Sequence, residues 1–156
     1  MDVASFDDIR DAFSARIERI VWATVTTVDT KGRPRSRLLH PVWDGPTGWI
    51  ATGRHSFKAK HLERNPYVSV SYWDPQHEQV YADCRAEWAD DLETKRRTWN
   101  LFKDTPPPLG YDPAMFWRSP EDPEFGVLRL EPWRIELYSL ADMAAQREPL
   151  VWRPQR

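Results

Sequence analysis

Residues 35–66 contain three short motifs that decide the fold: R-S-R-L-L-H at 35–40, W-I-A-T at 49–52 and S-F-K-A-K-H-L-E-R-N-P at 56–66. Asp44, Gly45 and Pro46 separate two strand-like segments and predict a hairpin, whose second strand leads into a helix that starts at Ser56. Hydroxyl and cationic side chains at the first turn of a helix, where free N–H groups and the positive dipole end also lie, suit a phosphate monoester. The spacing therefore predicts a phosphate site, and Arg35 adds a planar donor from the neighbouring strand.

The spacing of these residues resembles the flavin mononucleotide (FMN)-binding split-barrel family of pyridoxamine 5'-phosphate oxidase, over about residues 20–138. In that family an R-x-V-L-L-K strand, a Tyr/Phe-Thr pair and an S-R-K helix start hold the FMN phosphate and ribityl chain. A Gln-Val pair on a later strand contacts the ring. The matching positions here are Arg35, Leu38, Leu39, His40, Ala51, Thr52, Ser56, Phe57, Lys58, Gln79 and Val80.

The match departs from the family pattern at three of these positions. His40 stands where the family has Lys, Ala51 where it has an aromatic residue, and Phe57 where it often has Arg. One or two cationic contacts of the family are therefore missing, and Arg54 and Lys60 lie close enough in sequence to compensate for them.

A larger departure follows the late strand P-W-R-I-E-L-Y at 132–138, which resembles a family strand beginning P-x-x-I-E-F-W. In the authentic oxidase that strand continues into a Gly-Gly turn and an R-L-H-D-R run that holds the vitamin phosphate and ring. This chain has S-L-A-D at 139–142 instead. The resemblance thus implies the cofactor half of the site without the substrate half, and we do not expect a pyridoxamine phosphate oxidase.

The resemblance implies a role for each matching residue, and each also has a purely structural alternative. Arg35 and Lys58 would bind the phosphate, Ser56 and Thr52 the phosphate or ribityl chain, and Gln79 the ring edge. The backbone of Arg37, Leu38, Leu39 and His40 would run along the ring beside Ala51. Alternatively, Lys58 is a solvated helix cation, Ser56 an ordinary N-cap and Gln79 an edge-strand polar residue, while His40 either tunes the flavin or only bonds to the backbone.

Composition and charge exclude several other classes. The 22 Lys and Arg against 24 Asp and Glu give a net charge of -2, which offers no general attraction for nucleic acid or an anionic membrane. Cys84 is the single cysteine, and the four histidines lack metal-ligand spacing, so we expect no metal. No window approaches the roughly 18 apolar residues of a membrane span. We expect a soluble, cytoplasmic protein.

Residue patterning predicts a single domain over residues 1–156, large enough for its own core. Helices are expected at 6–19, 56–64 and 92–102, and strands at 22–28, 35–43, 48–52, 67–73, 79–88 and 126–140. Six prolines between 105 and 123 predict an ordered, irregular segment that serves as a lid or wraps a partner. Together with the resemblance, this gives a mainly β fold with flanking helices: a six-stranded antiparallel split β-barrel.

We expect an FMN-dependent oxidoreductase that transfers two electrons to or from a small substrate. A flavin carries the redox chemistry itself, so the sequence need not supply a catalytic acid, base or nucleophile. The resemblance also implies a homodimer with the cofactor at the subunit interface. One alternative is a deazaflavin-dependent reductase on the same fold, in which Arg33, Arg54 and Lys60 bind a longer anionic tail. Another is a non-catalytic flavin- or haem-binding module.

Overall fold

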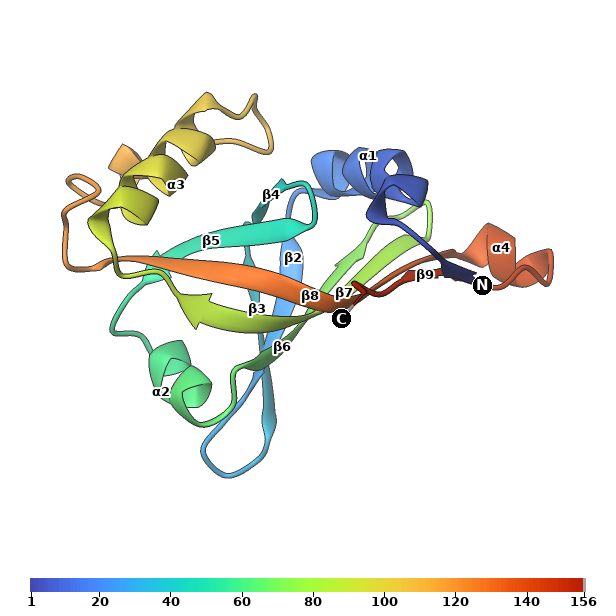
Figure 1. The fold of residues 1–156 in the computed structure, drawn as a ribbon, viewed down its shortest axis with the longest axis horizontal. Helices are drawn as coiled ribbons and strands as arrows, with labels where there is room; N and C mark the ends of the chain where they lie inside the picture. The colour runs from blue at the N-terminus through green and yellow to red at the C-terminus, as the bar shows by residue number, and fades with distance from the viewer. Residues whose placement is uncertain (156) are drawn as a thin grey trace.

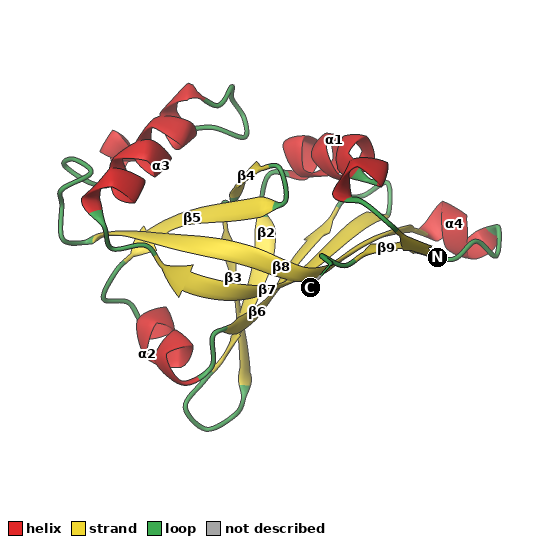
Figure 2. Ribbon diagram, in the orientation of Figure 1, coloured by secondary structure: helices red, strands yellow, loops and turns green. Residues whose placement is uncertain are grey.

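The computed structural model describes residues 1–155 and is dominated by one curved β-sheet with helices around it (Figures 1 and 2). The strands are β1 (Asp2–Val3), β2 (Ala23–Val28), β3 (Pro34–Leu39), β4 (Val42–Asp44), β5 (Thr47–Gly53), β6 (Tyr67–Trp73), β7 (Glu78–Trp88), β8 (Phe125–Ser139) and β9 (Leu150–Trp152). The α-helices are α1 (Arg10–Ile20), α2 (Phe57–Arg64), α3 (Leu92–Asp104) and α4 (Leu140–Ala144), and short 3-10 helices cover η1 (Phe6–Asp8) and η2 (Pro113–Met115).

The strands are hydrogen-bonded in the order β1-β9-β8-β7-β6-β2-β3, and β8 changes neighbours along its length. Its first half pairs with β5, its second half pairs with β9, and β7 follows it on the other side. Only β1 and β9 are parallel in the part of the chain described. The mainly β architecture with flanking helices is confirmed.

Residues 1–155 form nine strands where the sequence predicted six, for two reasons. The predicted strand at 35–43 is divided into β3 and β4 at His40 and Pro41, because proline has no N–H group to donate to a ladder. The short strands β1 and β9 add a parallel pair at the sheet edge, which the pattern of residues did not indicate. The other five predicted strands coincide with β2, β5, β6, β7 and β8 to within about one residue.

Alternation along the strands places the main core on one face of the sheet. Val25 of β2, Val70 of β6 and Ala82 of β7 are paired across the ladders and are almost fully buried. Their neighbours Thr24, Ser71 and Tyr81 point to the other face. We call these the inner and outer faces. α1 covers the inner face with Phe13 and Ile17, and α2 lies at the far end of the sheet (Figure 1).

The N-terminal helix differs from the predicted single helix at 6–19. It starts as η1 after Ser5, where a capping box is present: Ser5 accepts from Asp7 N and Asp8 accepts from Ser5 N. Ile9 then leaves regular helical geometry, with φ of -118°, and α1 follows.

The proline-rich segment, residues 105–123, is irregular apart from η2, and its backbone is held to α3. Tyr111 N donates to Phe102 O at 2.9 Å and Gly110 N donates to Pro106 O at 3.0 Å. A Cβ at Gly110 would lie 1.8 Å from Thr105 O, so only glycine fits this close approach of two backbone stretches.

Among the strand edges without hydrogen-bonded neighbours in residues 1–155, two belong to β3 and β5. Among residues 1–155, β3 pairs only with β2. β5 pairs with β8 on one side and, through Thr47–Trp49 alone, with β4 on the other. Residues 50–53 of β5 therefore keep a free edge, as does the whole of β3. Backbone donors and acceptors on these edges are available to a ligand.

No helix in the described chain combines the length and apolar character needed to cross a bilayer.

Candidate functional site

The first part of the site is a group of three cations, Arg35, Arg37 and Lys58, which we call the cation cluster. Arg35 and Arg37 alternate on β3, and Lys58 lies in the first turn of α2. Burial, and then the positive charge of Arg37, lower the pKa of Lys58. Burial, and then the charge of Arg35, lower the pKa of Arg37. The three side chains therefore lie close enough to repel one another.

None of these three cations has a carboxylate within ion-pair distance in the described part of the chain. Most other arginines do, for example Arg19 with Asp74 at 2.8 Å and Arg54 with Asp90 at 2.7 Å. Arg37 and Lys58 are partly buried, and Arg35 is exposed. Partly buried like charges without a carboxylate partner favour binding of an anion, because an anion removes their repulsion.

Ser56 adds a polar group to this cluster. It is the N-cap residue of α2 by position, with extended backbone, but its hydroxyl makes no capping hydrogen bond. Its Oγ is buried and has no partner among residues 1–155. A buried hydroxyl without a partner costs free energy, on the order of 1–3 kcal/mol. An anion at the start of α2 would satisfy Ser56 Oγ and the free N–H groups of the first turn together. The ordinary N-cap interpretation of Ser56 is therefore not supported.

Behind the cation cluster lies a buried hydrogen-bond network that the sequence did not indicate. Arg37 Nη1 donates to Thr27 Oγ1 at 2.8 Å and to Val25 O at 3.2 Å. Thr27 Oγ1 is also 2.8 Å from His61 Nδ1, and both side chains are buried. This network fixes the Arg37 guanidinium on the inner face. The available signal was the Arg35–Arg37 alternation, which placed both arginines on one face of the strand.

At the other end of β3 lies a cavity of about 880 Å³, which we call the aromatic pocket. Leu38, Leu39 and His40 of the β3 end line one side, together with Ala51, Thr52 and Gly53 of β5. The opposite side comes from the end of α1 and from the proline-rich segment, with Trp22, Tyr111, Met115, Phe116 and Trp117. Arg35 on β3 and His40 just after it are five residues apart, or about 17 Å along an extended chain. The cation cluster and the aromatic pocket thus both include residues of β3.

His40 links β3 to the proline-rich segment. Its Nε2 lies 2.6 Å from Leu109 O, and since a carbonyl oxygen only accepts, Nε2 carries the proton. The ring lies between Trp22 and Tyr111, with centroid distances of 5.0 and 4.8 Å. Burial lowers the pKa of His40, and the bond to Leu109 opposes this shift. A neutral, hydrogen-bonded imidazole thus occupies the position where the family has a lysine.

Gln79 lies apart from the other predicted site residues. Ladder pairing places it on the outer face, three strand spacings or about 14 Å from β3. Its Oε1 accepts from Tyr81 OH at 2.9 Å. A single chain therefore brings together the predicted residues of β3, β5 and α2, and leaves Gln79 outside that group.

The expected compensating cations are placed differently from the cation cluster. Arg54 donates through Nε and Nη2 to the two carboxylate oxygens of Asp90, at 2.7 and 3.0 Å, and stacks over Trp88. Lys60 is exposed on α2. Arg37, expected to contribute only backbone, instead supplies a cationic side chain to the cluster.

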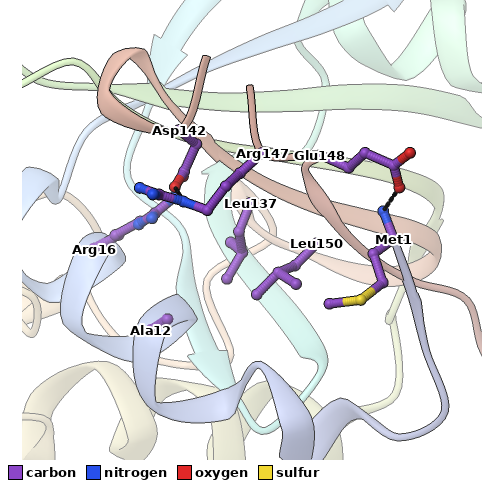
Figure 3. A pocket seen from close by; sticks show the side chains of 8 residues that line it. All are labelled: Met1, Ala12, Arg16, Leu137, Asp142, Arg147, Glu148 and Leu150. Atoms are coloured by element: carbon purple, nitrogen blue, oxygen red, sulfur yellow. Dashed lines mark hydrogen bonds and ion pairs between the residues drawn. The ribbon is translucent and has the colours of Figure 1, made fainter. Parts of the chain in front are cut away.

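A second cavity, of about 450 Å³, lies between α1, the end of β8 and the chain around β9 (Figure 3). Its charged side chains are already paired: Arg147 with Asp142 at 2.9 Å, and Arg16 with Glu78 at 3.2 Å. We assign no ligand to it. Within residues 1–155, no three His, Cys, Asp or Glu side chains are grouped as a metal site requires.

Cys84 is fully buried on the inner face, as expected for a small core residue. Burial raises the pKa of its thiol, so the reactive thiolate form is disfavoured.

Comparison with known proteins identifies relatives of this chain. The curated pyridoxine/pyridoxamine 5'-phosphate oxidase of Aliivibrio salmonicida is 33% identical over 90 residues, which cover 56% of this chain and 43% of the relative. This chain thus matches less than half the length of that relative.

Solved structures share the fold. A pyridoxamine 5'-phosphate oxidase-related, FMN-binding protein from Nostoc punctiforme superposes with a TM-score of 0.65 at 18% identity, covering 95% of this chain and 97% of that one. An F420 reductase superposes with a TM-score of 0.58 at 20% identity, covering 78% and 94%.

A family model described as pyridoxamine 5'-phosphate oxidase matches residues 9–139, which include the cation cluster, the free strand edges and all of β2 to β8. With most of its length matched, the chain belongs to the pyridoxamine 5'-phosphate oxidase family.

Proposed function

We propose that this protein is an FMN-dependent oxidoreductase built on a six-stranded split β-barrel of the FMN-binding type. The observation that carries the proposal is the cation cluster beside Ser56 Oγ, which has no partner among residues 1–155, near the free edges of β3 and β5. A phosphate monoester supplies the missing negative charge and the missing acceptors. The free edges of β3 and β5 lead from there to the aromatic pocket, which suits a flat ring.

In this proposal Arg35, Arg37 and Lys58 bind the phosphate, and Ser56 and Thr52 bind the phosphate or the ribityl chain. The backbone of residues 37–40 lies along the ring, next to Leu38, Leu39 and Ala51. FMN, when bound, supplies the two-electron chemistry. The protein positions the ring and limits the access of water to it.

Titration with FMN, followed by the quenching of flavin fluorescence, tests the phosphate assignment. Arg35→Ala and Lys58→Ala should each weaken FMN binding by about 1.5–3 kcal/mol, the range of a charge-assisted hydrogen bond, which corresponds to roughly 10- to 150-fold. Lys60→Ala is the matched control, because Lys60 is exposed on the same helix, and it should change the affinity by less than about twofold. Unchanged affinity in both test variants would remove the phosphate assignment.

The deazaflavin coenzyme is the second candidate, since the F420 reductase shares the fold. Its longer anionic tail needs further cations. Two of the three expected ones are engaged, because Arg33 pairs with Asp29 at 3.0 Å and Arg54 pairs with Asp90. This favours FMN. Parallel titrations with both cofactors decide between them: preference for the coenzyme with the tail supports the reductase. Tight, stoichiometric binding of flavin without oxidation or reduction of any donor would instead indicate a non-catalytic module.

The position of Gln79 supports a homodimer with the cofactor at its interface. Gln79 lies on the outer face, as does Leu38, so the Gln79 of a second copy could approach the first copy's groove. Complementation tests this arrangement. Lys58→Ala and Gln79→Ala proteins should each bind FMN weakly. Mixed dimers of the two should recover one tight site for every two chains. No recovery, with dimers verified by sedimentation, would place the whole site within one chain.

A further inference from the structure

The aromatic pocket contains two residues that can carry charge, and neither is free to neutralise a ligand. Arg19 donates from Nε to Asp74 and from Nη2 to Glu78, both at 2.8 Å. His40 is held through Nε2 by Leu109 O and is kept neutral by burial. Burial also raises the pKa of Tyr111 to about 12, so its phenol stays protonated. An anion entering the pocket would lose water without gaining a counter-charge, which is unfavourable.

The rim of the same pocket exposes large apolar side chains. Met115 is 73% exposed, Phe116 67% and Trp22 56%. These residues come from two segments far apart in sequence and lie on one opening. Tyr111, Phe116 and Trp117 also contact one another as a series of rings, with centroid distances of 6.2 and 5.6 Å. Aromatic walls of this kind favour a flat, apolar guest through stacking and burial.

The cation cluster lies outside the lining of the aromatic pocket. If it takes the cofactor phosphate, the charged part of the cofactor is bound elsewhere and the pocket receives only uncharged groups. At about 880 Å³ the cavity is near the upper end of the roughly 300–1,000 Å³ range of small-molecule sites. It therefore has room for a second ring beside the cofactor ring.

We propose that the aromatic pocket selects an uncharged, planar aromatic ring as substrate and rejects phosphorylated or carboxylated rings. This inference rests on the proposed function, because it assigns the substrate class of the same site. His40 and Trp22 set the selectivity: His40 withholds the cation that an anionic substrate needs, and Trp22 provides a stacking surface. The proline-rich segment, whose Leu109 O accepts a hydrogen bond from His40, forms the opposite wall of the pocket.

Equilibrium dialysis with two matched probes, 2-naphthol and 2-naphthyl phosphate, tests the inference on FMN-saturated protein. Saturation with FMN keeps the probe phosphate out of the cation cluster. We expect 2-naphthol to bind at least about tenfold more tightly than 2-naphthyl phosphate. His40→Lys should reduce that ratio by at least about fivefold, because the added cation strengthens the binding of 2-naphthyl phosphate. A tighter anionic probe in the unmodified protein would overturn the proposal, as would a ratio unchanged by His40→Lys.

The stacking role of Trp22 has a matched control in Trp133, which is 49% exposed on β8 and does not line the pocket. Trp22→Ala should weaken 2-naphthol at least about fivefold, and Trp133→Ala by less than about twofold. Equal losses in the two variants would contradict the assignment. A separate FMN titration distinguishes the two levels of failure. FMN binding without 2-naphthol binding removes this inference alone, whereas 2-naphthol binding to protein that takes no FMN removes the proposed function.

Discussion

The cation cluster and the aromatic pocket lie at opposite ends of β3, and they treat charge in opposite ways. The cation cluster gathers three positive side chains that have no carboxylate within ion-pair distance among residues 1–155. The aromatic pocket pairs or neutralises each chargeable group that lines it. In the proposed function, β3 therefore joins an anion-binding end and an uncharged end of one elongated ligand site. The following variants and conditions test whether the two ends act independently.

The largest effect is expected from Gly110→Ala, which disrupts the pocket wall and leaves the cation cluster intact. The added Cβ would meet Thr105 O at 1.8 Å, so the backbone of the proline-rich segment must move. We expect a loss of about 3 kcal/mol in the free energy of unfolding, or detachment of the segment. Urea denaturation measures the first and proteolysis the second. 2-Naphthol binding should be lost while FMN still binds.

Gly45→Ala serves as the control for that variant. Gly45, unlike Gly110, has a positive φ, at +57°, but a Cβ there meets nothing within 4 Å. Only the cost of the left-handed conformation applies, about 1 kcal/mol. A loss as large as for Gly110→Ala would contradict the steric explanation.

Thr27→Val should damage the cation-binding end alone. The variant removes the oxygen that accepts from Arg37 and that bonds to His61 Nδ1, and leaves both partners unsatisfied near the core. We expect about 1–3 kcal/mol lower unfolding free energy, with weaker FMN binding and unchanged 2-naphthol binding. Thr26 lies on the opposite face of the same strand, and Thr26→Val should change the free energy of unfolding by no more than about 0.5 kcal/mol. If 2-naphthol binding also fell, the two ends would not be independent.

A smaller effect should appear at mildly acidic pH, from the uncharged end. Burial lowers the pKa of His40 in the folded protein below its unfolded value near 6.5. The unfolded state then binds more protons as pH falls through this value, so acid should reduce stability and alkali should restore it. The loss should be smaller than for Thr27→Val because the imidazole is only half-buried. Urea midpoints at pH 5.5 and 7.5 measure it. In His40→Gln the difference should shrink, and an unchanged difference would exclude His40 as the cause.

The smallest effect, with the opposite sign, is expected from Lys58→Met in protein without cofactor. Removing one cation relieves its repulsion with Arg37, while Met keeps the apolar stem. The unfolding free energy should rise by about 0.5 kcal/mol while FMN affinity falls. Lys60→Met should change neither quantity appreciably. A loss of stability in Lys58→Met would indicate that Lys58 has a counter-charge.

The strands were predictable because alternation of apolar residues, as in β6 and β7, reports directly on which face is buried. The start of α2 and the Arg35 to Lys58 grouping also followed from spacing. Pro41 also signals the break between β3 and β4, but the predicted strand at 35–43 continued past it and was wrong there. Residues brought together by tertiary packing were not predictable: His61 is far in the chain from Thr27 and Arg37, and Trp22 is far from Phe116. Sequence position also could not show that the hydroxyl of Ser56, the N-cap residue of α2, makes no capping hydrogen bond.

A free strand edge can pair with a strand of another molecule and so extend the sheet, but β3 is poorly suited to such pairing. Two copies meeting edge to edge would bring Arg35 and Arg37 against the same positive charges, and Pro41 ends the run of amide donors just past the strand. A compact anion faces neither obstacle. In the proposed function, the residues that bind a small anion therefore also disfavour edge-to-edge pairing of two copies while the site is empty.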